Sequence, residues 1–331
     1  MPKDTYKDMH KDMEKDMDID NNNNIGSAIQ YFRETYHISQ SKLCKGICSV
    51  STLSRIEAGE RDIDGFILET FLERLGRIPY QYELILNDSD YEAYQSRMEI
   101  NKLIEDKAID EARRLVNEYD ELVSDKGTPH RQFVMVCNAR LNELEGGKPE
   151  ATIDMLMEAI SCTVPDFNTD EISEYFLSYS EFGIILEILQ KLILFKMTDR
   201  AHKTLNQIID YMFWHSQMEH NVNIYPKVAA IGSRFLLEQN ELDRALELCN
   251  KGLEMNKGSR RMDYIGELNL IKAQATEGKF KAVGLWKSCD KGECINLYLK
   301  AYYSFKFFEE YIVTDMIKKH LQEEYQWEDI D

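Results

Sequence analysis

The sequence predicts an all-α protein, in which a small N-terminal helical domain precedes a long array of paired helices. Three observations support this prediction. Beyond Pro79 the chain has few prolines, and its apolar residues recur at the spacing of helix faces. That region contains no convincing run of alternating β-branched residues, the pattern that indicates a strand. In addition, the segment from Ile38 to Gly59 has the sequence of two short capped helices joined by a glycine turn.

Residues 1–24 are expected to form a disordered charged extension. Lys-Asp-Met occurs three times with a period of four, starting at Lys7, Lys11 and Lys15, and four asparagines follow. A helix of this composition would carry a stripe of methionines but too little apolar surface to pack on its own. An amphipathic arm that binds a partner is the alternative for this segment.

Residues 25–78 are predicted to form a compact domain of five helices. Ser39 is a suitable N-cap for a short helix through Lys45, and Gly46 permits the sharp turn to a second helix. Ser49 caps that second helix. The predicted core of the domain consists of apolar side chains on all the helices: Ile25, Ile29, Phe32, Leu53, Ile56, Phe66, Leu68, Phe71, Leu72 and Leu75.

The outer face of the second helix carries short side chains and one arginine. Val50, Ser51, Ser54 and Arg55 fall opposite the buried positions. Side chains of this kind can reach base edges in the major groove of DNA. The pattern therefore predicts a DNA-reading helix. The alternative is a small helical domain whose serines are only caps and whose arginine is a surface charge.

These residues resemble the phage-repressor type of helix-turn-helix, in which one helix opens with Ser-Gln and the next ends in Ser-Arg-Ile-Glu-x-Gly. Ser39-Gln40 and the run from Ser54 to Gly59 match those motifs. The resemblance covers about residues 25–78 and implies a buried ion pair between Arg33 and Glu57. It also implies that Gln40 touches a phosphate, and it places the DNA-binding residues at Gln40, Ser49, Val50, Ser51, Thr52, Ser54 and Arg55.

Residues 79–95 are predicted to be a linker, and residues 96–331 an α-solenoid of tetratricopeptide-like repeats. The clearest repeat unit runs from Phe235 to Gly252. A plain bundle of antiparallel helices is the alternative to the solenoid. Small residues that would let the second helix of each pair approach the first are expected at Ala112, Ala151, Ala201, Ala245 and Ala282. Residues 295–325 are apolar almost all round, which indicates a terminal cap or a dimer surface.

Charge is distributed unevenly along the chain. The net charge of −19 divides into −3 for residues 1–24, zero for residues 25–78 and −16 for residues 79–331. A neutral reading domain on an acidic body should bind non-specific DNA poorly, because phosphate neutralisation supplies most of that affinity. Specific binding would then depend on a dimer.

Several classes of protein are not expected. The chain has no apolar run near the roughly 20 residues of a membrane span and no hydrophobic signal region, so a cytoplasmic protein is expected. Its seven cysteines lack CxxC spacing, and its seven histidines lack metal-ligand spacing. Reduced thiols are expected, with a redox-sensing pair as the alternative. No Walker loop or nucleophile elbow occurs, so neither an enzyme nor a cofactor is expected.

A repressor-type reader joined to about five tetratricopeptide-like repeats resembles the PlcR, PrgX, Rgg and NprR family of peptide-pheromone regulators of Gram-positive bacteria. The turn from Gly46 to Ser49 is also similar to the turn in this family. The resemblance implies a cytoplasmic homodimer that binds promoter DNA and is switched by a short imported signalling peptide in the concave face of the repeats. A repeat domain that binds a protein partner instead of a peptide is the alternative.

Repeat position suggests which side chains line the concave face. The residues eleven positions before three of the alanines are Arg140, Gln190 and Arg234, and Lys272 lies near that register in the last repeat. All four are hydrogen-bond donors that could hold peptide carbonyls and a terminal carboxylate. Asn138, Asn142 and Asn269 are further candidates for peptide binding. Solvated polar residues on exposed helix faces are the alternative.

Overall fold

The computed structural model describes residues 25–77, 87–215, 219–288 and 290–327, with only the backbone described for residues 219–223. All regular elements in these ranges are helices, and no strand occurs among them. Residues 1–24, which were expected to form a disordered extension, lie outside the described ranges. No helix in these ranges has the length and apolar character that a bilayer crossing needs.

The N-terminal domain consists of helices α2 (Ile25–Thr35), α3 (Gln40–Leu43), α4 (Val50–Glu57) and α5 (Gly65–Arg74). The predicted caps are confirmed, because Ser39 accepts a hydrogen bond from the Lys42 amide and Ser49 accepts one from the Thr52 amide. Five helices were predicted for residues 25–78, whereas the described part of that range contains four.

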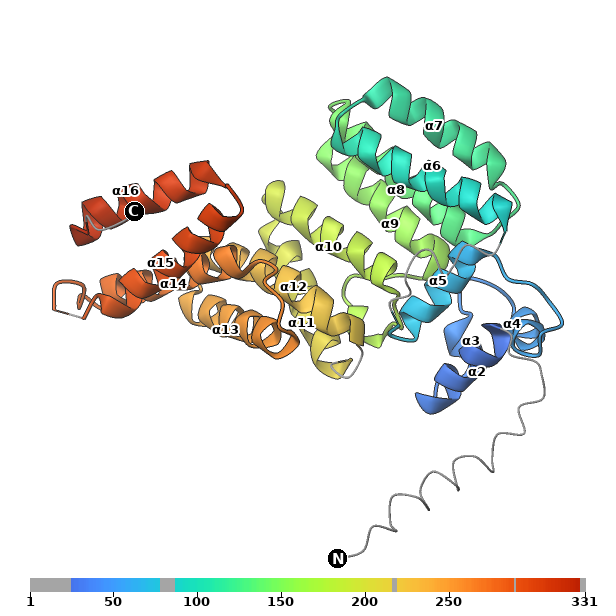
Figure 1. The fold of residues 1–331 in the computed structure, drawn as a ribbon, viewed down its shortest axis with the longest axis horizontal. Helices are drawn as coiled ribbons and strands as arrows, with labels where there is room; N and C mark the ends of the chain where they lie inside the picture. The colour runs from blue at the N-terminus through green and yellow to red at the C-terminus, as the bar shows by residue number, and fades with distance from the viewer. Residues whose placement is uncertain (1–24, 78–86, 216–218, 289, 328–331) are drawn as a thin grey trace, which may run out of the picture.

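Helix pairs follow one another from residue 88 to the C-terminal helix, and Figure 1 shows them as a stacked array. The predicted solenoid is confirmed. Its helices are α6 (Asp88–Glu105), α7 (Ile109–Leu122), α8 (Thr128–Leu144), α9 (Pro149–Thr163), α10 (Tyr179–Leu194), α11 (Thr198–Trp214), α12 (Glu219–Glu238), α13 (Leu242–Ser259), α14 (Ile265–Ala282), α15 (Gly292–Phe307) and α16 (Tyr311–Tyr325), with the 3-10 helix η2 (Ile172–Glu174) before α10.

The linker prediction was wrong for residues 88–95, which form the first turns of α6. Asn87 caps this helix by accepting a hydrogen bond from the Asp90 amide at 2.9 Å. Ala93 and Ile100 then lie one above the other on its buried face. The acidic first turn of α6, with Asp88 and Asp90, is the composition that favours a helix N-terminus.

Three of the five expected small residues occupy the predicted place. Ala112, Ala201 and Ala245 are fully buried in the first turn of α7, α11 and α13. The other two assignments were wrong. Pro149 starts α9, so Thr152 is the buried small residue and Ala151 is exposed. Ala282 is the exposed last residue of α14, because a loop separates α14 from α15.

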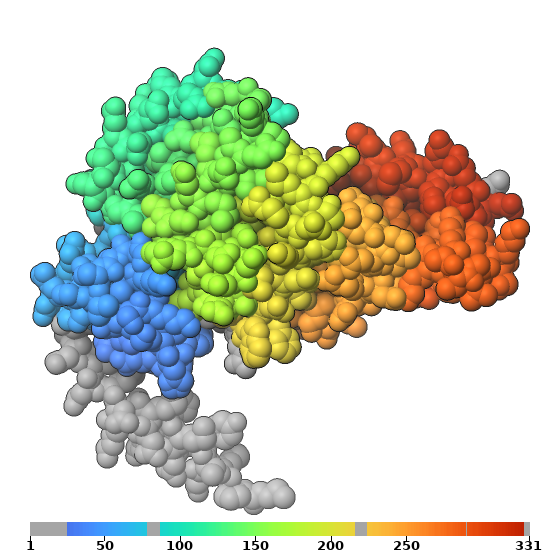
Figure 2. Space-filling view, turned by 180° about the vertical axis from the view of Figure 1, so that it is seen from behind, coloured from blue at the N-terminus to red at the C-terminus, as the bar shows by residue number. Residues whose placement is uncertain are grey.

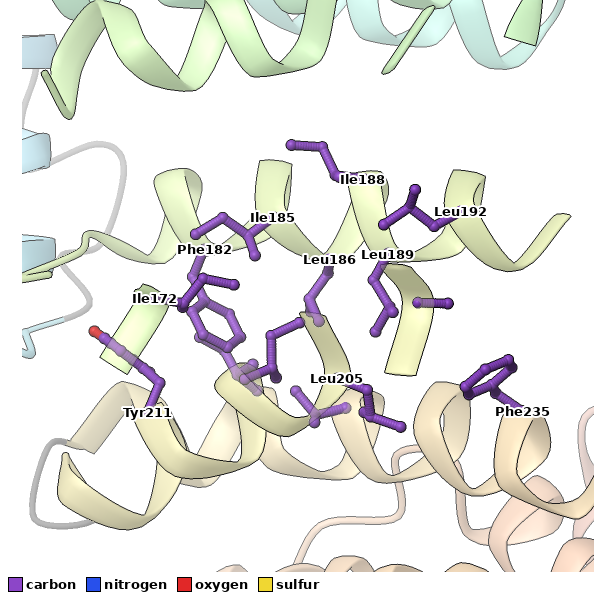
Figure 3. Close-up of a cluster of buried hydrophobic side chains, with 14 of the residues drawn as sticks. Ile172, Phe182, Ile185, Leu186, Ile188, Leu189, Leu192, Leu205, Tyr211 and Phe235 are labelled. Carbon is purple, nitrogen blue, oxygen red and sulfur yellow. The ribbon is translucent and has the colours of Figure 1, made fainter. Parts of the chain in front are cut away.

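One continuous apolar core runs through the repeats from α8 to α14. Figure 3 shows its centre, where Phe182, Leu186 and Leu189 of α10 point toward Leu205 and Tyr211 of α11. Because α10 also carries buried residues on its opposite face, it is enclosed by neighbours on both sides. A small shift of α10 would therefore be felt by the repeats before and after it.

The six cysteines that the structure describes are free thiols. Cys44 and Cys48 straddle the turn of the N-terminal domain. Burial raises the pKa of the Cys48 thiol to about 11. The thiolate form that a redox-sensing pair needs is therefore scarce at neutral pH.

Candidate DNA-reading helix and ligand groove

The face of α4 that was predicted to read bases is open to solvent. Val50 is 45% exposed, and Ser51, Ser54 and Arg55 are exposed beside it, whereas Leu53 is fully buried on the opposite face. Among the residues that the structure describes, the Arg55 guanidinium contacts an acid only through a loose ion pair with Glu60, at 3.7 Å. Its side chain is therefore free to extend away from the domain.

Two of the predicted DNA-binding residues have a role within the helix itself. The Ser49 hydroxyl caps α4 and lies 2.9 Å from the Thr52 hydroxyl. Both side chains are at the first turn of α4, where they fix the helix N-terminus. Direct contact of Ser49 and Thr52 with DNA stays a prediction.

The ion pair implied by the repressor resemblance is present beneath α4. Arg33 donates to both carboxylate oxygens of Glu57, at 2.7 and 2.9 Å, and Glu57 is buried. Gln40 adds a third donor, since its side-chain amide lies 2.7 Å from Glu57. These contacts join α2, α3 and α4. A phosphate contact by Gln40 stays a prediction, and its bond to Glu57 was not foreseen.

The first helices of successive pairs line a groove on the inner side of the repeats. A cavity of about 520 Å³ is bordered by α6, α8, α10 and α12, and a second one of about 230 Å³ adjoins it between α10, α12 and the loop before α14. Both cavities are lined by Tyr179, Gly183 and Lys227. We call this pair of adjoining cavities the inner groove.

Two of the predicted peptide-binding residues, Arg140 and Gln190, line the larger cavity. Arg140 is held by Glu187 at 2.8 Å, and its guanidinium also lies 3.5 Å from the Asn101 amide oxygen. If Thr152 is taken as the reference residue of this repeat, the residue eleven positions before it is Leu141, which is buried. Arg140 therefore reaches the groove from the neighbouring position.

The other predicted peptide-binding residues do not form one row with Arg140 and Gln190. Arg234 donates to Gln274, and Lys272 lines a separate cavity of about 420 Å³ between α13 and α15. Asn142 donates to Thr152, and the buried Asn269 donates to the Ile265 carbonyl. Asn138 is half-buried on α8. Arg234 was placed from Ala245, which does occupy its predicted buried position, so spacing from the small residue alone does not identify the residues that line the groove.

Sequence reasoning missed Tyr179, Gly183 and Lys227, the residues common to both cavities. Gly183 lies inside α10, and a Cβ atom added there would meet nothing within 4 Å. A glycine inside a helix costs about 1 kcal/mol relative to alanine, and a reason for its presence is then expected. That glycine was the signal available in the sequence.

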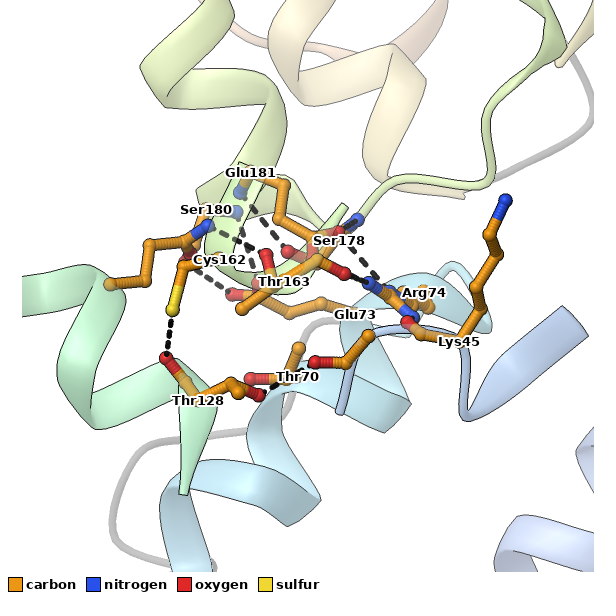
Figure 4. A network of polar contacts seen from close by, with 12 residues as sticks. Lys45, Thr70, Glu73, Arg74, Thr128, Cys162, Thr163, Ser178, Ser180 and Glu181 are labelled. Atoms are coloured by element: carbon orange, nitrogen blue, oxygen red, sulfur yellow. Dashed lines mark hydrogen bonds and ion pairs between the residues drawn. The ribbon is translucent and has the colours of Figure 1, made fainter. Parts of the chain in front are cut away.

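A buried ion pair fastens the N-terminal domain to the repeats. Arg74, at the end of α5, donates to both oxygens of Glu181 in α10, at 2.6 and 3.2 Å, with the side chains 2% and 0% exposed (Figure 4). Burial alone would raise the pKa of Glu181, but Arg74 and the Ser178 amide hold that pKa below its usual value. Glu181 is therefore a carboxylate in this site.

Arg74 also binds three backbone carbonyls. It donates to those of Leu43 and Lys45 at the end of α3, and to that of Thr163 at the end of α9. Gly46, with φ of +77°, follows at once, and a Cβ atom there would lie 1.9 Å from the Thr163 oxygen. Gly46 therefore serves both the turn and the close approach of the two domains.

A second contact links the domain directly to the inner groove. Glu73 of α5 accepts hydrogen bonds from the Ser180 amide at 3.0 Å and from the Ser180 hydroxyl at 3.3 Å. Ser180 and Phe66, the latter also from α5, line the larger cavity. Burial, with the nearby charges of Glu69 and Glu181, raises the pKa of Glu73 to about 8. The N-terminal domain thus supplies part of the groove wall.

A third contact lies at the start of α5. His130 of α8 is buried, and its two ring nitrogens lie 2.9 Å from the Asp64 carboxylate and 2.7 Å from the Tyr119 hydroxyl. Asp64 is also the N-cap of α5. Both ends of α5 are therefore attached to the repeats, and Figure 2 shows the domain seated against them.

Comparison with known proteins agrees with both halves of this architecture. The helix-turn-helix family model matches residues 29–82. Comparison with curated proteins gave no match. The structure of Bacillus thuringiensis PlcR in complex with the peptide PapR7 and DNA is similar, with a TM-score of 0.53, 19% identity, and coverage of 88% of this chain and 98% of that chain. Its apo form gives a TM-score of 0.54 and 17% identity, with coverage of 88% and 97%. The chain has the fold of PlcR.

A further structure, the Streptococcus dysgalactiae SHP pheromone receptor Rgg2, covers 90% of this chain and 98% of its own at 14% identity, with a TM-score of 0.47. The PlcR fold extends over most of the chain.

Removing one partner of the Arg74–Glu181 pair should be strongly destabilising. Arg74→Met leaves a carboxylate buried without a counter-charge, and the free energy of unfolding should fall by about 3–5 kcal/mol. Arg74→Met combined with Glu181→Leu should recover much of that loss. Arg113→Met, which breaks the exposed pair with Glu145, is the control and should cost less than about 1 kcal/mol. Urea unfolding measures all four proteins, and equal losses for Arg74→Met and Arg113→Met would contradict a buried pair.

The raised pKa of Glu73 should make stability depend on pH in a defined direction. Between its unfolded value near 4.5 and its folded value of about 8, Glu73 binds a proton only in the folded protein. Its contribution to stability is present at low pH and is lost as pH rises toward 8.

Glu73→Gln, which mimics the protonated side chain, should therefore gain stability relative to the parent between pH 5 and pH 8 by more than about 1 kcal/mol, since one pKa unit corresponds to about 1.4 kcal/mol. Glu92→Gln, on the exposed face of α6, is the matched control. Urea unfolding at the two pH values gives the result. If the free energies of unfolding of the parent and of Glu73→Gln change in parallel with pH, Glu73 is charged in the folded protein.

Proposed function

We propose that this protein is a cytoplasmic transcriptional regulator that binds promoter DNA as a homodimer and is switched by a short imported signalling peptide in the inner groove. One observation carries the proposal: Phe66 of the DNA-reading domain lines the larger cavity of the groove, and Ser180, which also lines it, is held by Glu73 of the same domain. In this proposal the protein acts by binding alone, without a catalytic step or a cofactor.

The exposed face of α4 supports the DNA-binding part of this proposal. Docking of the N-terminal domain uses α5 and the turn after α3, so the side chains of Val50, Ser51 and Arg55 remain accessible. The similar PlcR structure contains both a peptide and DNA. A helix with one arginine and short side chains has the chemistry to read base edges in the major groove.

The size of the inner groove supports a peptide over a folded partner. Its two cavities fall in or just below the range of about 300–1,000 Å³ that is typical of small-ligand pockets. A stable interface with a folded protein buries about 800 Å² on each partner and needs a larger open surface. An extended peptide can instead insert alternate side chains into adjoining cavities.

The route from peptide to DNA follows from the contacts at the first turn of α10. Tyr179 and Ser180 line the groove, and Glu181, the next residue, holds Arg74. A peptide that moves this turn changes the seat of α5 and of the turn after α3. The peptide would change DNA affinity by the difference between its binding free energies for the two positions of this turn. Such differences are typically about 1–3 kcal/mol.

An apolar surface on α15 and α16 supports the homodimer. Ile312 is 88% exposed, and four aromatic side chains are exposed near it in sequence: Tyr303, Phe307, Phe308 and Tyr311. Large exposed apolar patches mark association surfaces. Two reading domains in one dimer would then match two half-sites on the DNA. Analytical ultracentrifugation tests this, and a monomer at micromolar concentration would contradict it.

Arg55 is expected to read a base. Because it is the only long donor on the outer face of α4, Arg55→Ala should weaken binding to the preferred operator by about 1–3 kcal/mol and relax preference at one position. Operators are selected by the parent protein from random double-stranded DNA and titrated by fluorescence anisotropy. Arg114→Ala, an exposed change on α7, is the control. Unchanged affinity and preference for Arg55→Ala would exclude base readout by this residue.

Gly183→Phe should close the inner groove without harming the fold. The new ring enters open space, and the helix gains a residue of better propensity than glycine. Gly258→Phe is the matched control, because Gly258 also lies on a helix with nothing within 4 Å of an added Cβ but borders neither cavity of the groove.

Pools of synthetic hexapeptides are incubated with each protein, and retained peptides are identified by mass spectrometry after ultrafiltration. The parent and Gly258→Phe should retain the same peptides, Gly183→Phe should retain none of them, and all three should bind the selected operator in the absence of peptide. Retention of the same peptides by Gly183→Phe would show that the groove is not the peptide site.

A further inference from the structure

The inner groove contains one lysine that stands apart from the other cations around it. Arg140 is paired with Glu187 at 2.8 Å, Lys191 with Glu143 at 2.7 Å, and Arg261 with Asp263 at 2.5 Å. Lys227 has no hydrogen bond or ion pair to any residue in the part of the chain that the structure describes. It is the cation in the groove whose charge those residues leave uncompensated.

The position of Lys227 is central. It projects from α12, is half-buried, and lines both the larger and the smaller cavity of the groove. The smaller cavity is also lined by four apolar or aromatic side chains, Phe182, Leu186, Ile224 and Tyr264, and by Arg261 and Asp263. A positive charge therefore lines a small cavity that combines these side chains with the Arg261–Asp263 ion pair.

Physical chemistry indicates what such a site binds. A half-buried ammonium group is stabilised by an anion within hydrogen-bond distance, and charge-assisted hydrogen bonds are about twice as strong as neutral ones. A linear peptide with an unmodified C-terminus carries a carboxylate there, directly beside the last side chain. Charge and apolar cavity thus match the two parts of a C-terminal residue.

We infer that Lys227 binds the C-terminal carboxylate of the peptide, and that the last side chain, an apolar one, enters the smaller cavity. The remainder of the peptide then runs through the larger cavity past Ser180 toward Arg140. This inference rests on the proposed function and adds the direction of the peptide and the class of its final residue. It also places the peptide over the contact between Ser180 and Glu73.

The experiment uses three pools of hexapeptides and the full-length protein. The first pool lacks Asp and Glu and has free C-termini; the second has the same sequences with amidated C-termini. The third is amidated and includes Asp and Glu, so that its only carboxylates are on side chains. Retention is measured for the parent, Lys227→Met, Lys227→Arg and Gly183→Phe, with circular dichroism as the check that each variant is folded.

The parent should retain the first pool about ten- to a hundredfold better than the second, and the retained peptides should end in apolar residues. Lys227→Met should lose this preference and Lys227→Arg should keep it. A preference that survives in Lys227→Met would overturn the inference, and so would retention of the third pool in place of the first. Either result leaves the proposed function intact if Gly183→Phe still abolishes retention. Equal retention by the parent and Gly183→Phe, or none by either, would instead contradict the proposed function.

Discussion

The ion pair between Arg74 and Glu181 fixes where the DNA-reading domain lies on the repeats. Both charges are removed from water, which is costly unless every donor and acceptor is used. Here the guanidinium binds a carboxylate and three carbonyls. The carboxylate also accepts a hydrogen bond from the backbone amide of Ser178, the N-cap of α10. One buried cation thereby ties together the ends of α3, α5 and α9 and the start of α10.

The inner groove and the domain interface share the same first turn of α10. Tyr179 and Ser180 face the groove, while Glu181 faces Arg74. Since α10 is also enclosed by the apolar core, it transmits a displacement as a rigid element. Under the proposed function, peptide binding and DNA binding are coupled over two residues of chain, without a long path of side-chain rearrangements.

Local patterns in the sequence were sufficient for the helices, the caps at Ser39 and Ser49, and the open face of α4, because these depend on neighbours within one or two turns. The Arg33–Glu57 pair followed from the repressor motif. Arg74 and Glu181, by contrast, lie 107 residues apart, and no periodicity connects them. The groove was predicted only in part. Arg140 and Gln190 line it, whereas Arg234, placed from the correctly buried Ala245, donates to Gln274 instead.

The N-terminal domain contacts the repeats through α5 and the turn after α3, whereas the outer face of α4 is exposed to solvent. Substitutions at Val50, Ser51 or Arg55 therefore touch neither the Arg74–Glu181 pair nor the inner groove. Under the proposed function, operator preference could diverge in a lineage of duplicated genes while the response to the peptide is retained, and the reverse could occur through changes in the groove. Gly46 would be shared by all such descendants, because a side chain there would separate the two halves that each lineage modifies independently.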